Sequence, residues 1–165
     1  MIVFAAAAQA DIWRCGGTNG IALEYVNNAN DARIRSCSRV TGGHPDGSLW
    51  KHVTRSDTRL FDVYVIKRPV LTEGKFLKTW FLNTYDESMS LRDGKTYQSS
   101  KNLSLFDCKS KRFALRQIIY YTDTTAQGNV VRSNSMSDSE LEFDDPSPGS
   151  VGEAILEQAC GNSKP

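Results

Sequence analysis

The feature that most constrains the fold is a long run in which apolar and polar side chains alternate on both sides of a cysteine. It covers residues 97–122 and has Cys108 near its middle. A period of two is typical of strands that have one buried face. The parity of the apolar positions changes between Leu105 and Phe106, which predicts a bulge near the cysteine. The run therefore predicts two long strands that meet near Cys108.

A short helix is predicted near the end of the chain, because the sequence marks both of its ends. Pro146 disfavours a helix upstream, and Ser150 and Glu153 form the Ser-x-x-Glu pattern of a capping box. Gly161 can end the helix in the left-handed conformation. Apolar residues inside this span recur every three or four positions, and Cys160 lies at the edge of their stripe.

The first ten residues resemble the second half of a signal peptide. They form an apolar run that ends in Ala8-Gln9-Ala10, which fits the small-x-small rule for cleavage before Asp11. An alanine-rich first helical turn is the alternative interpretation. We therefore expect an exported chain, located in the periplasm or on the outer cell surface. No run approaches the roughly 20 apolar residues that a membrane-spanning helix needs.

Cysteines in an exported chain of this size predict disulfides, and four of them allow three pairings. Their spacing separates an early pair from a late pair, and pairing within each group is the most economical choice. Each link would contribute roughly 3 to 4 kcal/mol. A zinc site is the alternative, but the sequence has no Cys-x-x-Cys spacing. The predicted disulfides are Cys15 with Cys37 and Cys108 with Cys160.

Turn residues and composition predict how the chain is divided. Its 165 residues suit one ordinary domain with a small addition. After the signal-peptide remnant, residues 1–10, residues 11–37 resemble a small disulfide-clipped β-hairpin module of envelope proteins. Residues 38–58 are rich in Gly, Ser, Thr and charged side chains and are predicted to be a linker. Residues 59–165 would form the main domain.

Several short motifs occur together between residues 60 and 160. They are Asp107-Cys108-Lys109 followed by Lys111-Arg112, then Gly128-Asn129-Val130-Val131, and Pro148-Gly149-Ser150 ahead of a helix that ends in Ala159-Cys160. In these motifs the chain resembles the surface-adhesin protein E family of Gram-negative bacteria. The resemblance implies an α+β fold, in which an antiparallel sheet of about six strands is tied to a C-terminal helix by one disulfide. It also implies a secreted or surface-attached protein that binds host macromolecules.

Basic residues are frequent in and around the predicted long strands. Arg112 and Arg116 have the same strand parity and would lie on one face beside Tyr120. Such a cationic and aromatic patch suits sulfated glycans or acidic protein segments. The simpler interpretation is an ordinary solvent-exposed sheet face, on which lysines also protect an edge. The candidate ligand-binding residues are Lys95, Lys101, Lys109, Lys111, Arg112, Arg116 and Tyr120.

Other functional classes find little support in the sequence. A net charge of +1 on 24% charged residues gives no reason to expect binding to nucleic acid. The chain has no Gly-x-Ser-x-Gly, His-Glu-x-x-His or phosphate-binding glycine motif. Its two histidines, His44 and His52, fall in the predicted linker, where a solvated side chain is the ordinary case. We therefore expect no catalysis, no metal and no cofactor.

Two functions are compatible with these observations. The first is an exported, adhesin-like binding protein that contacts host extracellular-matrix or serum proteins or sulfated glycans. The second is a structural or assembly protein of the periplasm that has no host ligand. Fold alone does not decide between them, because related folds host unrelated functions. The sequence also leaves a homodimer open.

Overall fold

The computed structural model describes residues 12–15, 24–26, 38–40, 45–67 and 71–161. These residues belong to two units, which are divided between His44 and Pro45. In the first unit, β1 (Ile12–Cys15) lies between β2 (Glu24–Val26) and β3 (Ser38–Val40) in an antiparallel sheet. The predicted Cys15–Cys37 disulfide and the predicted signal-peptide remnant lie outside what the structure describes.

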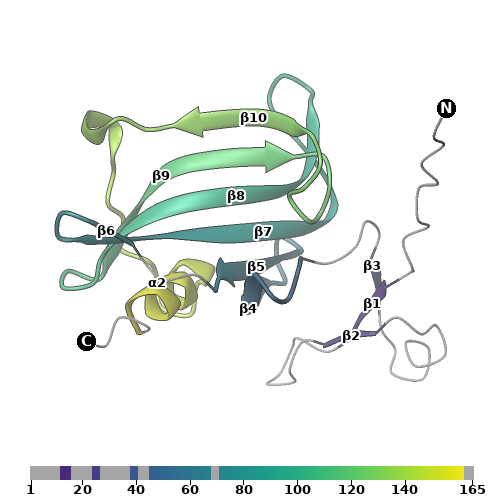
Figure 1. The fold of residues 1–165 in the computed structure, drawn as a ribbon, viewed down its shortest axis with the longest axis horizontal. Helices are drawn as coiled ribbons and strands as arrows, with labels where there is room; N and C mark the ends of the chain where they lie inside the picture. The colour runs from purple at the N-terminus through teal and green to yellow at the C-terminus, as the bar shows by residue number, and fades with distance from the viewer. Residues whose placement is uncertain (1–11, 16–23, 27–37, 41–44, 68–70, 162–165) are drawn as a thin grey trace, which may run out of the picture. The chain divides into compact units, whose positions relative to one another are not determined.

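The second unit is an antiparallel sheet with one α-helix near the end of the chain (Figure 1). Its strands follow the order β10-β9-β8-β7-β5-β4, and β6 pairs with β7 off this path. The predicted α+β architecture is therefore confirmed. The elements are β4 (Trp50–Ser56), β5 (Phe61–Ile66), β6 (Leu71–Glu73), β7 (Phe76–Ser90), β8 (Thr96–Asp107), β9 (Arg112–Tyr121), β10 (Val130–Ser135), the 3-10 turn η1 (Asp138–Glu140) and α2 (Val151–Gly161).

Strand β4 lies inside the stretch that was predicted to be a linker, residues 38–58. It pairs with β5 along its length, from Trp50 opposite Ile66 to Ser56 opposite Phe61. Apart from Trp50, its residues as a whole are half-buried or exposed. A strand at the edge of a sheet needs few apolar side chains, so its polar sequence resembles that of a loop.

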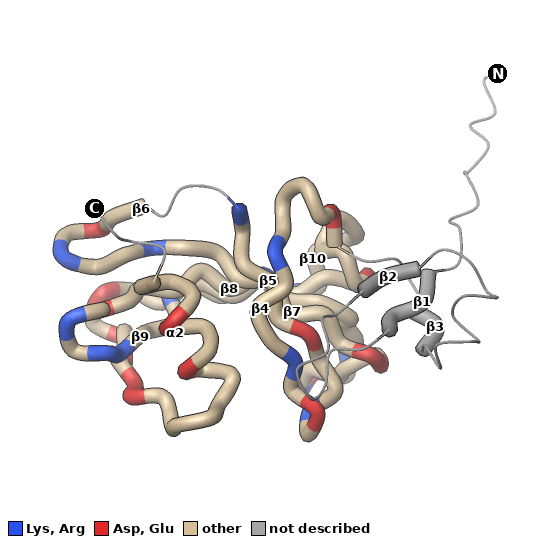
Figure 2. Tube along the Cα trace, turned by 90° about the horizontal axis from the view of Figure 1, so that it is seen from below, with Lys and Arg blue, Asp and Glu red and all other residues tan. Residues whose placement is uncertain are grey.

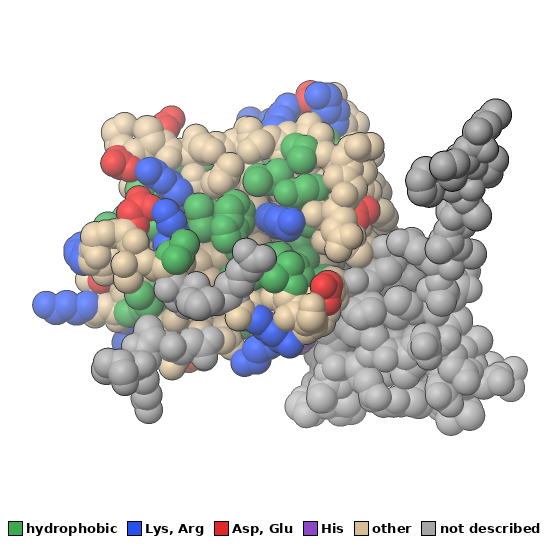
Figure 3. All heavy atoms as spheres, viewed as in Figure 1, with side chains coloured by type: hydrophobic (Ala, Val, Ile, Leu, Met, Phe, Trp, Pro, Cys, Tyr) green, Lys and Arg blue, Asp and Glu red, His purple; other side chains and the backbone are tan. Residues whose placement is uncertain are grey.

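Consecutive side chains of each strand point to opposite faces of the sheet. The face that carries α2, here called the helix face, contains a core made of Val63, Val65, Phe81, Phe106, Leu156 and Ala159. The other face, here called the open face, has no α-helix packed on it among the described residues. Figure 3 shows hydrophobic side chains over the middle of the open face, with basic side chains among them.

Cys108 and Cys160 form a disulfide, which confirms the prediction for this pair. Their Cα atoms are 5.6 Å apart, and the bond ties the end of β8 to the last turn of α2. The start of α2 has the predicted cap, because the backbone N–H of Glu153 donates to Ser150 Oγ at 3.2 Å. The Glu153 carboxylate accepts from the N–H of Gly149, one residue before the position that a capping box uses.

The predicted bulge lies in β9 rather than beside the cysteine. Leu103 is opposite Gln117 and Ser104 is opposite Leu115, so Arg116 is an extra residue in β9. The apparent change of parity in β8 has another cause. Leu105 on the open face and Phe106 on the helix face are both buried, at 1% and 0% exposure, because the sheet is covered on both sides there. In the sequence, two adjacent buried residues give the same break in alternation that a bulge would give.

Candidate functional site

The turn between β8 and β9 carries exposed cations beyond the end of the sheet. Asp107 and Arg112 face each other across the two strands, and four residues connect them. The backbone N–H of Ser110 donates to the Asp107 carboxylate at 3.1 Å, which fixes the turn and lowers the pKa of Asp107. Lys109, Lys111 and Arg112 are all exposed. In the described part of the chain they form no ion pair.

Lys75 joins these residues from a second turn, between β6 and β7. Its ammonium lies 3.3 Å from the Asp107 carboxylate and 5.1 Å from the centre of the Phe76 ring. Its side chain is 71% exposed, so the pairing leaves most of it in water. Figure 2 shows both turns at the same end of the sheet. We call Lys75, Lys109, Lys111 and Arg112 the basic tip.

A hollow of about 440 Å³ lies between the two turns of the basic tip. Lys75 and Lys109 supply the cations among its lining residues, and Leu77 and Phe106 supply apolar surface. Asp107 is the acid among these residues, but it is only 5% exposed and already bound to Ser110 and Lys75. The basic tip therefore offers positive charge around a shallow and partly apolar depression.

Lys95 and Lys101 lie away from the basic tip. Lys95 is exposed in the turn between β7 and β8, at the opposite end of β8 from Asp107. Lys101 is half-buried on the open face, where its ammonium donates to the carbonyl of Ala126 at 3.0 Å and lies 5.0 Å from the Tyr121 ring centre. Burial lowers the pKa of Lys101. These two lysines do not extend the basic tip.

Arg116 and Tyr120 do not share a face, although strand parity predicted that they would. As the extra residue of the bulge, Arg116 turns toward the open face and pairs with Asp138 at 2.6 Å and Glu73 at 3.7 Å. Tyr120 is opposite Ser100 and lies on the helix face. The bulge interrupts the alternation between these two residues and separates their side chains.

Tyr120 belongs to a row of tyrosines on the helix face. The rings of Tyr85 and Tyr97 are 5.3 Å apart, and those of Tyr97 and Tyr120 are 4.7 Å apart, both in edge contact. Burial and the neighbouring hydroxyls raise the pKa of Tyr97 to about 12. These rings stabilise one another across three strands, so Tyr120 has a packing role that its sequence context did not indicate.

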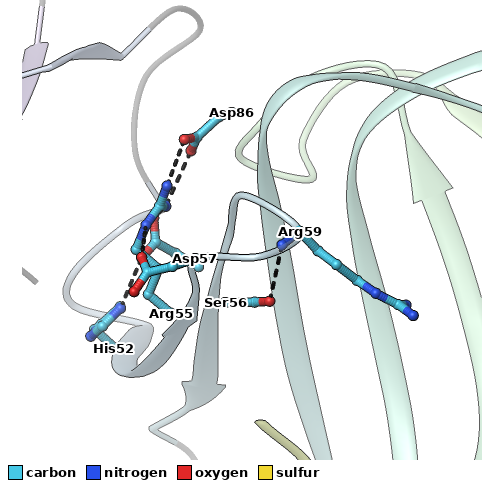
Figure 4. A network of polar contacts seen from close by, with 7 residues as sticks. His52, Arg55, Ser56, Asp57, Arg59 and Asp86 are labelled. Carbon is cyan, nitrogen blue, oxygen red and sulfur yellow. Dashed lines mark hydrogen bonds and ion pairs between the residues drawn. The ribbon is translucent and has the colours of Figure 1, made fainter. Parts of the chain in front are cut away.

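His52 is held in a polar network near the turn between β4 and β5 (Figure 4). Its ring lies 3.1 Å from the Asp62 carboxylate, which also accepts from Arg55 at 3.1 Å. Arg55 further pairs with Asp57 at 3.1 Å and with Asp86 at 2.7 Å. Among the described residues, no group of three or more His, Cys, Asp or Glu side chains is placed to hold a metal ion. The network is a structural link between β4, β5 and β7.

Comparison with known proteins identifies the family of the second unit. The sequence model of surface-adhesin protein E matches residues 50–161, which include every strand from β4 to β10, the basic tip and α2. The chain belongs to the surface-adhesin protein E family. No curated protein sequence matches the chain. Membership of the family supports an exported, adhesin-type protein that binds host protein.

Solved structures show the same fold. Crystal form II of Haemophilus influenzae protein E matches with a TM-score of 0.53 at 9% identity, covering 74% of this chain and 94% of that one. A second structure of Haemophilus influenzae protein E matches with a TM-score of 0.52 at 10% identity, covering 74% and 91%. At this sequence identity the similarity establishes the fold, but it does not transfer the role of any individual residue to this chain. No helix in the described residues is long and apolar enough to cross a membrane.

Proposed function

We propose that this surface adhesin binds its host ligand at the basic tip. The ligand would be an acidic segment of an extracellular-matrix or serum protein, or a sulfated glycan. The observation that carries the proposal is the exposure of Lys109, Lys111 and Arg112, which form no ion pair in the described part of the chain. Clustered cations both attract an acidic partner from a distance and hold it once bound.

The conformation of Lys111 supports a role in binding rather than in folding. Its φ is +53°, a left-handed conformation that glycine or asparagine adopts more easily than lysine. A lysine there costs about 1 kcal/mol relative to glycine. The charge of an exposed lysine contributes little to stability. The turn thus keeps a cation where folding alone would favour glycine.

The test compares two variants that lose the same charge. Lys109→Gln, Lys111→Gln and Arg112→Gln remove the exposed cations of the β8–β9 turn. Lys51→Gln, Arg59→Gln and Arg92→Gln remove exposed cations elsewhere on the second unit. We expect the first variant to bind heparin and vitronectin about tenfold more weakly at 0.1 M salt, and the second to bind like wild type. Equal loss in both variants would show that net charge, not the tip, determines binding.

Salt and a single substitution sharpen this test. Binding at the tip should weaken steeply between about 0.1 M and 1 M salt, since the Debye length falls from about 10 Å to about 3 Å. Lys111→Gly should weaken binding yet unfold at a slightly higher urea concentration, because it removes the cation and the left-handed strain together. If the wild type binds neither ligand at low salt, the proposal fails. A role inside the periplasm would then replace it, and protease treatment of intact cells would show the chain protected.

A further inference from the structure

The segment that follows β10 folds back over the sheet and presents a row of acids. Residues 137–145, here called the acidic strap, carry Asp138, Glu140, Glu142, Asp144 and Asp145, and all five are exposed. Between Ser133 and Cys160 the chain has no lysine or arginine. The strap is therefore a strongly acidic surface that no basic residue of its own segment offsets.

Two apolar side chains anchor the strap to the open face. Phe143 stacks on Phe76 with the ring centres 4.8 Å apart, and Leu141 lies beside it, half-buried. The next residue, Asp144, exchanges two backbone hydrogen bonds with Phe113 of β9, at 3.0 and 3.2 Å. The apolar side chains point toward the sheet and the acids point to solvent, as alternation in an extended segment requires.

A pocket of about 410 Å³ remains between the strap and the turn that joins β6 to β7. Its lining is mainly apolar, with Glu73 and Asp138 as the charged residues. The volume falls in the range of pockets that take small ligands or a bulky side chain. We call it the strap pocket; it is lined by Glu73, Gly74, Phe76, Leu105, Asp138, Leu141 and Phe143.

The charges at the rim of the strap pocket divide into a balanced and an unbalanced group. Arg116 bridges Glu73 and Asp138, and Lys78 pairs with Glu73 at 2.6 Å, so these four residues neutralise one another. The remaining strap acids, such as Glu142, have no cation of this kind beside them in the described residues. Lys75 lies 5.1 Å from the Phe76 ring, but it pairs with Asp107, so the strap acids leave the rim of the apolar pocket negative.

We propose that the strap pocket is a second docking site, which takes one bulky apolar side chain from a partner segment whose flanking residues are lysine or arginine. The apolar lining selects the anchor, because aromatic side chains buried in pockets carry most of the affinity of such contacts. The strap acids favour lysine or arginine on either side of that anchor, because their charges are complementary. This site prefers the opposite charge to the basic tip, and it does not depend on binding at the tip.

Short peptides provide the probe. The full chain is titrated into dye-labelled Lys-Lys-Trp-Lys-Lys, and fluorescence anisotropy is recorded. Two matched peptides serve as comparisons: Lys-Lys-Ala-Lys-Lys lacks the anchor, and Glu-Glu-Trp-Glu-Glu reverses the flanks. We expect the alanine peptide to bind about tenfold more weakly, and the acidic peptide not to bind. Equal binding of the acidic and basic peptides, or no binding of the basic tryptophan peptide, would overturn the proposal.

Variants locate the site. Leu141→Ala should weaken the tryptophan peptide and leave the alanine peptide unchanged. Glu142→Gln with Asp145→Asn should weaken both basic peptides, whereas Glu87→Gln with Glu157→Gln removes exposed acids elsewhere and should change neither. Thermal unfolding of each variant checks that it is folded. Wild-type binding by both pocket variants would refute the location.

Sedimentation of the chain without peptide gives a final check. If the wild type forms a dimer and the strap variants dissociate it, a second copy of the chain occupies the pocket, and the proposed partner is overturned.

Discussion

The two ends of the main sheet are held together by different physical means. At the end that carries the basic tip, a disulfide and the apolar contacts of α2 hold the strands and the helix. At the far end, where β4 turns into β5 and β9 into β10, hydrogen bonds and ion pairs to Asp62 and Asp123 do most of this work. The tip end can therefore lose surface charge without unfolding, whereas the far end depends on its charges.

The largest expected effect comes from the disulfide. Cys108→Ala with Cys160→Ala opens a link between residues separated by 52 positions and should lower the free energy of unfolding by about 4 kcal/mol. A helix as short as α2 is marginal in water without an anchor, so its amides should exchange first while the strands stay protected. Urea unfolding and hydrogen exchange measure both effects. Exchange that rises first in β4 or β5 would contradict the division between the two ends.

A smaller effect is expected at the far end from Arg55→Met. The side chain of Arg55 is 8% exposed, and its loss removes a cation from Asp62, whose side chain is 3% exposed. Leaving this buried carboxylate without its arginine should lower the free energy of unfolding by about 3 kcal/mol. Arg59→Met is the matched control, because Arg59 is exposed and lies in the adjoining turn, and it should cost less than about 0.5 kcal/mol. If urea unfolding shows equal losses, the network contributes nothing specific.

The smallest effect is expected from Asp123→Asn, which also tests pH dependence. Burial alone would raise the pKa of Asp123, but hydrogen bonds from Thr125, Gln127 and Gly128 outweigh it and hold the pKa below its usual range. Stability from this carboxylate is thus present above its unfolded pKa and lost as the pH falls through the folded value. The variant should lose about 1 kcal/mol at pH 7.

The acid side of that prediction is checked by repeating urea unfolding between pH 7 and pH 3. The difference between wild type and Asp123→Asn should shrink as the pH falls, because the wild-type carboxylate becomes neutral as well. A difference that stays constant with pH would show that the loop depends on the shape of the side chain and not on its charge.

Local patterns in the sequence were sufficient to predict most of the sheet and the helix. Alternation marks β8 and β9, and Ser150 and Glu153 mark the start of α2. The same reasoning missed β4, because an edge strand needs no apolar periodicity, and it placed the bulge at Leu105 because it could not know that both faces are covered there. Neither β4 nor the position of the bulge could be predicted from the sequence alone, because both depend on what packs beside each strand in the fold.

In the candidate site, too, some residues could be grouped from the sequence and others are brought together only by the fold. Lys109, Lys111 and Arg112 are adjacent in the chain, so their proximity could be predicted without a fold. Lys75 reaches them only because β6, β7 and β8 are neighbours in the sheet. Tyr120, by contrast, left the predicted patch because of one extra residue in β9, which turns it to the other face. The ligand-binding role of these residues stays a prediction until the charge variants are measured.

The bulge at Arg116 also decides which small genetic deletions the chain can survive. Losing one codon inside a strand normally turns every later side chain to the wrong face. Deleting Arg116 alone would instead leave Leu115 and Gln117 as consecutive partners of Ser104 and Leu103, and later residues such as Tyr120 would keep their faces. The cost would be the ion pairs with Glu73 and Asp138. A single-residue deletion in β9 is therefore compatible with the fold at this position, and related chains that lack it could keep the same architecture.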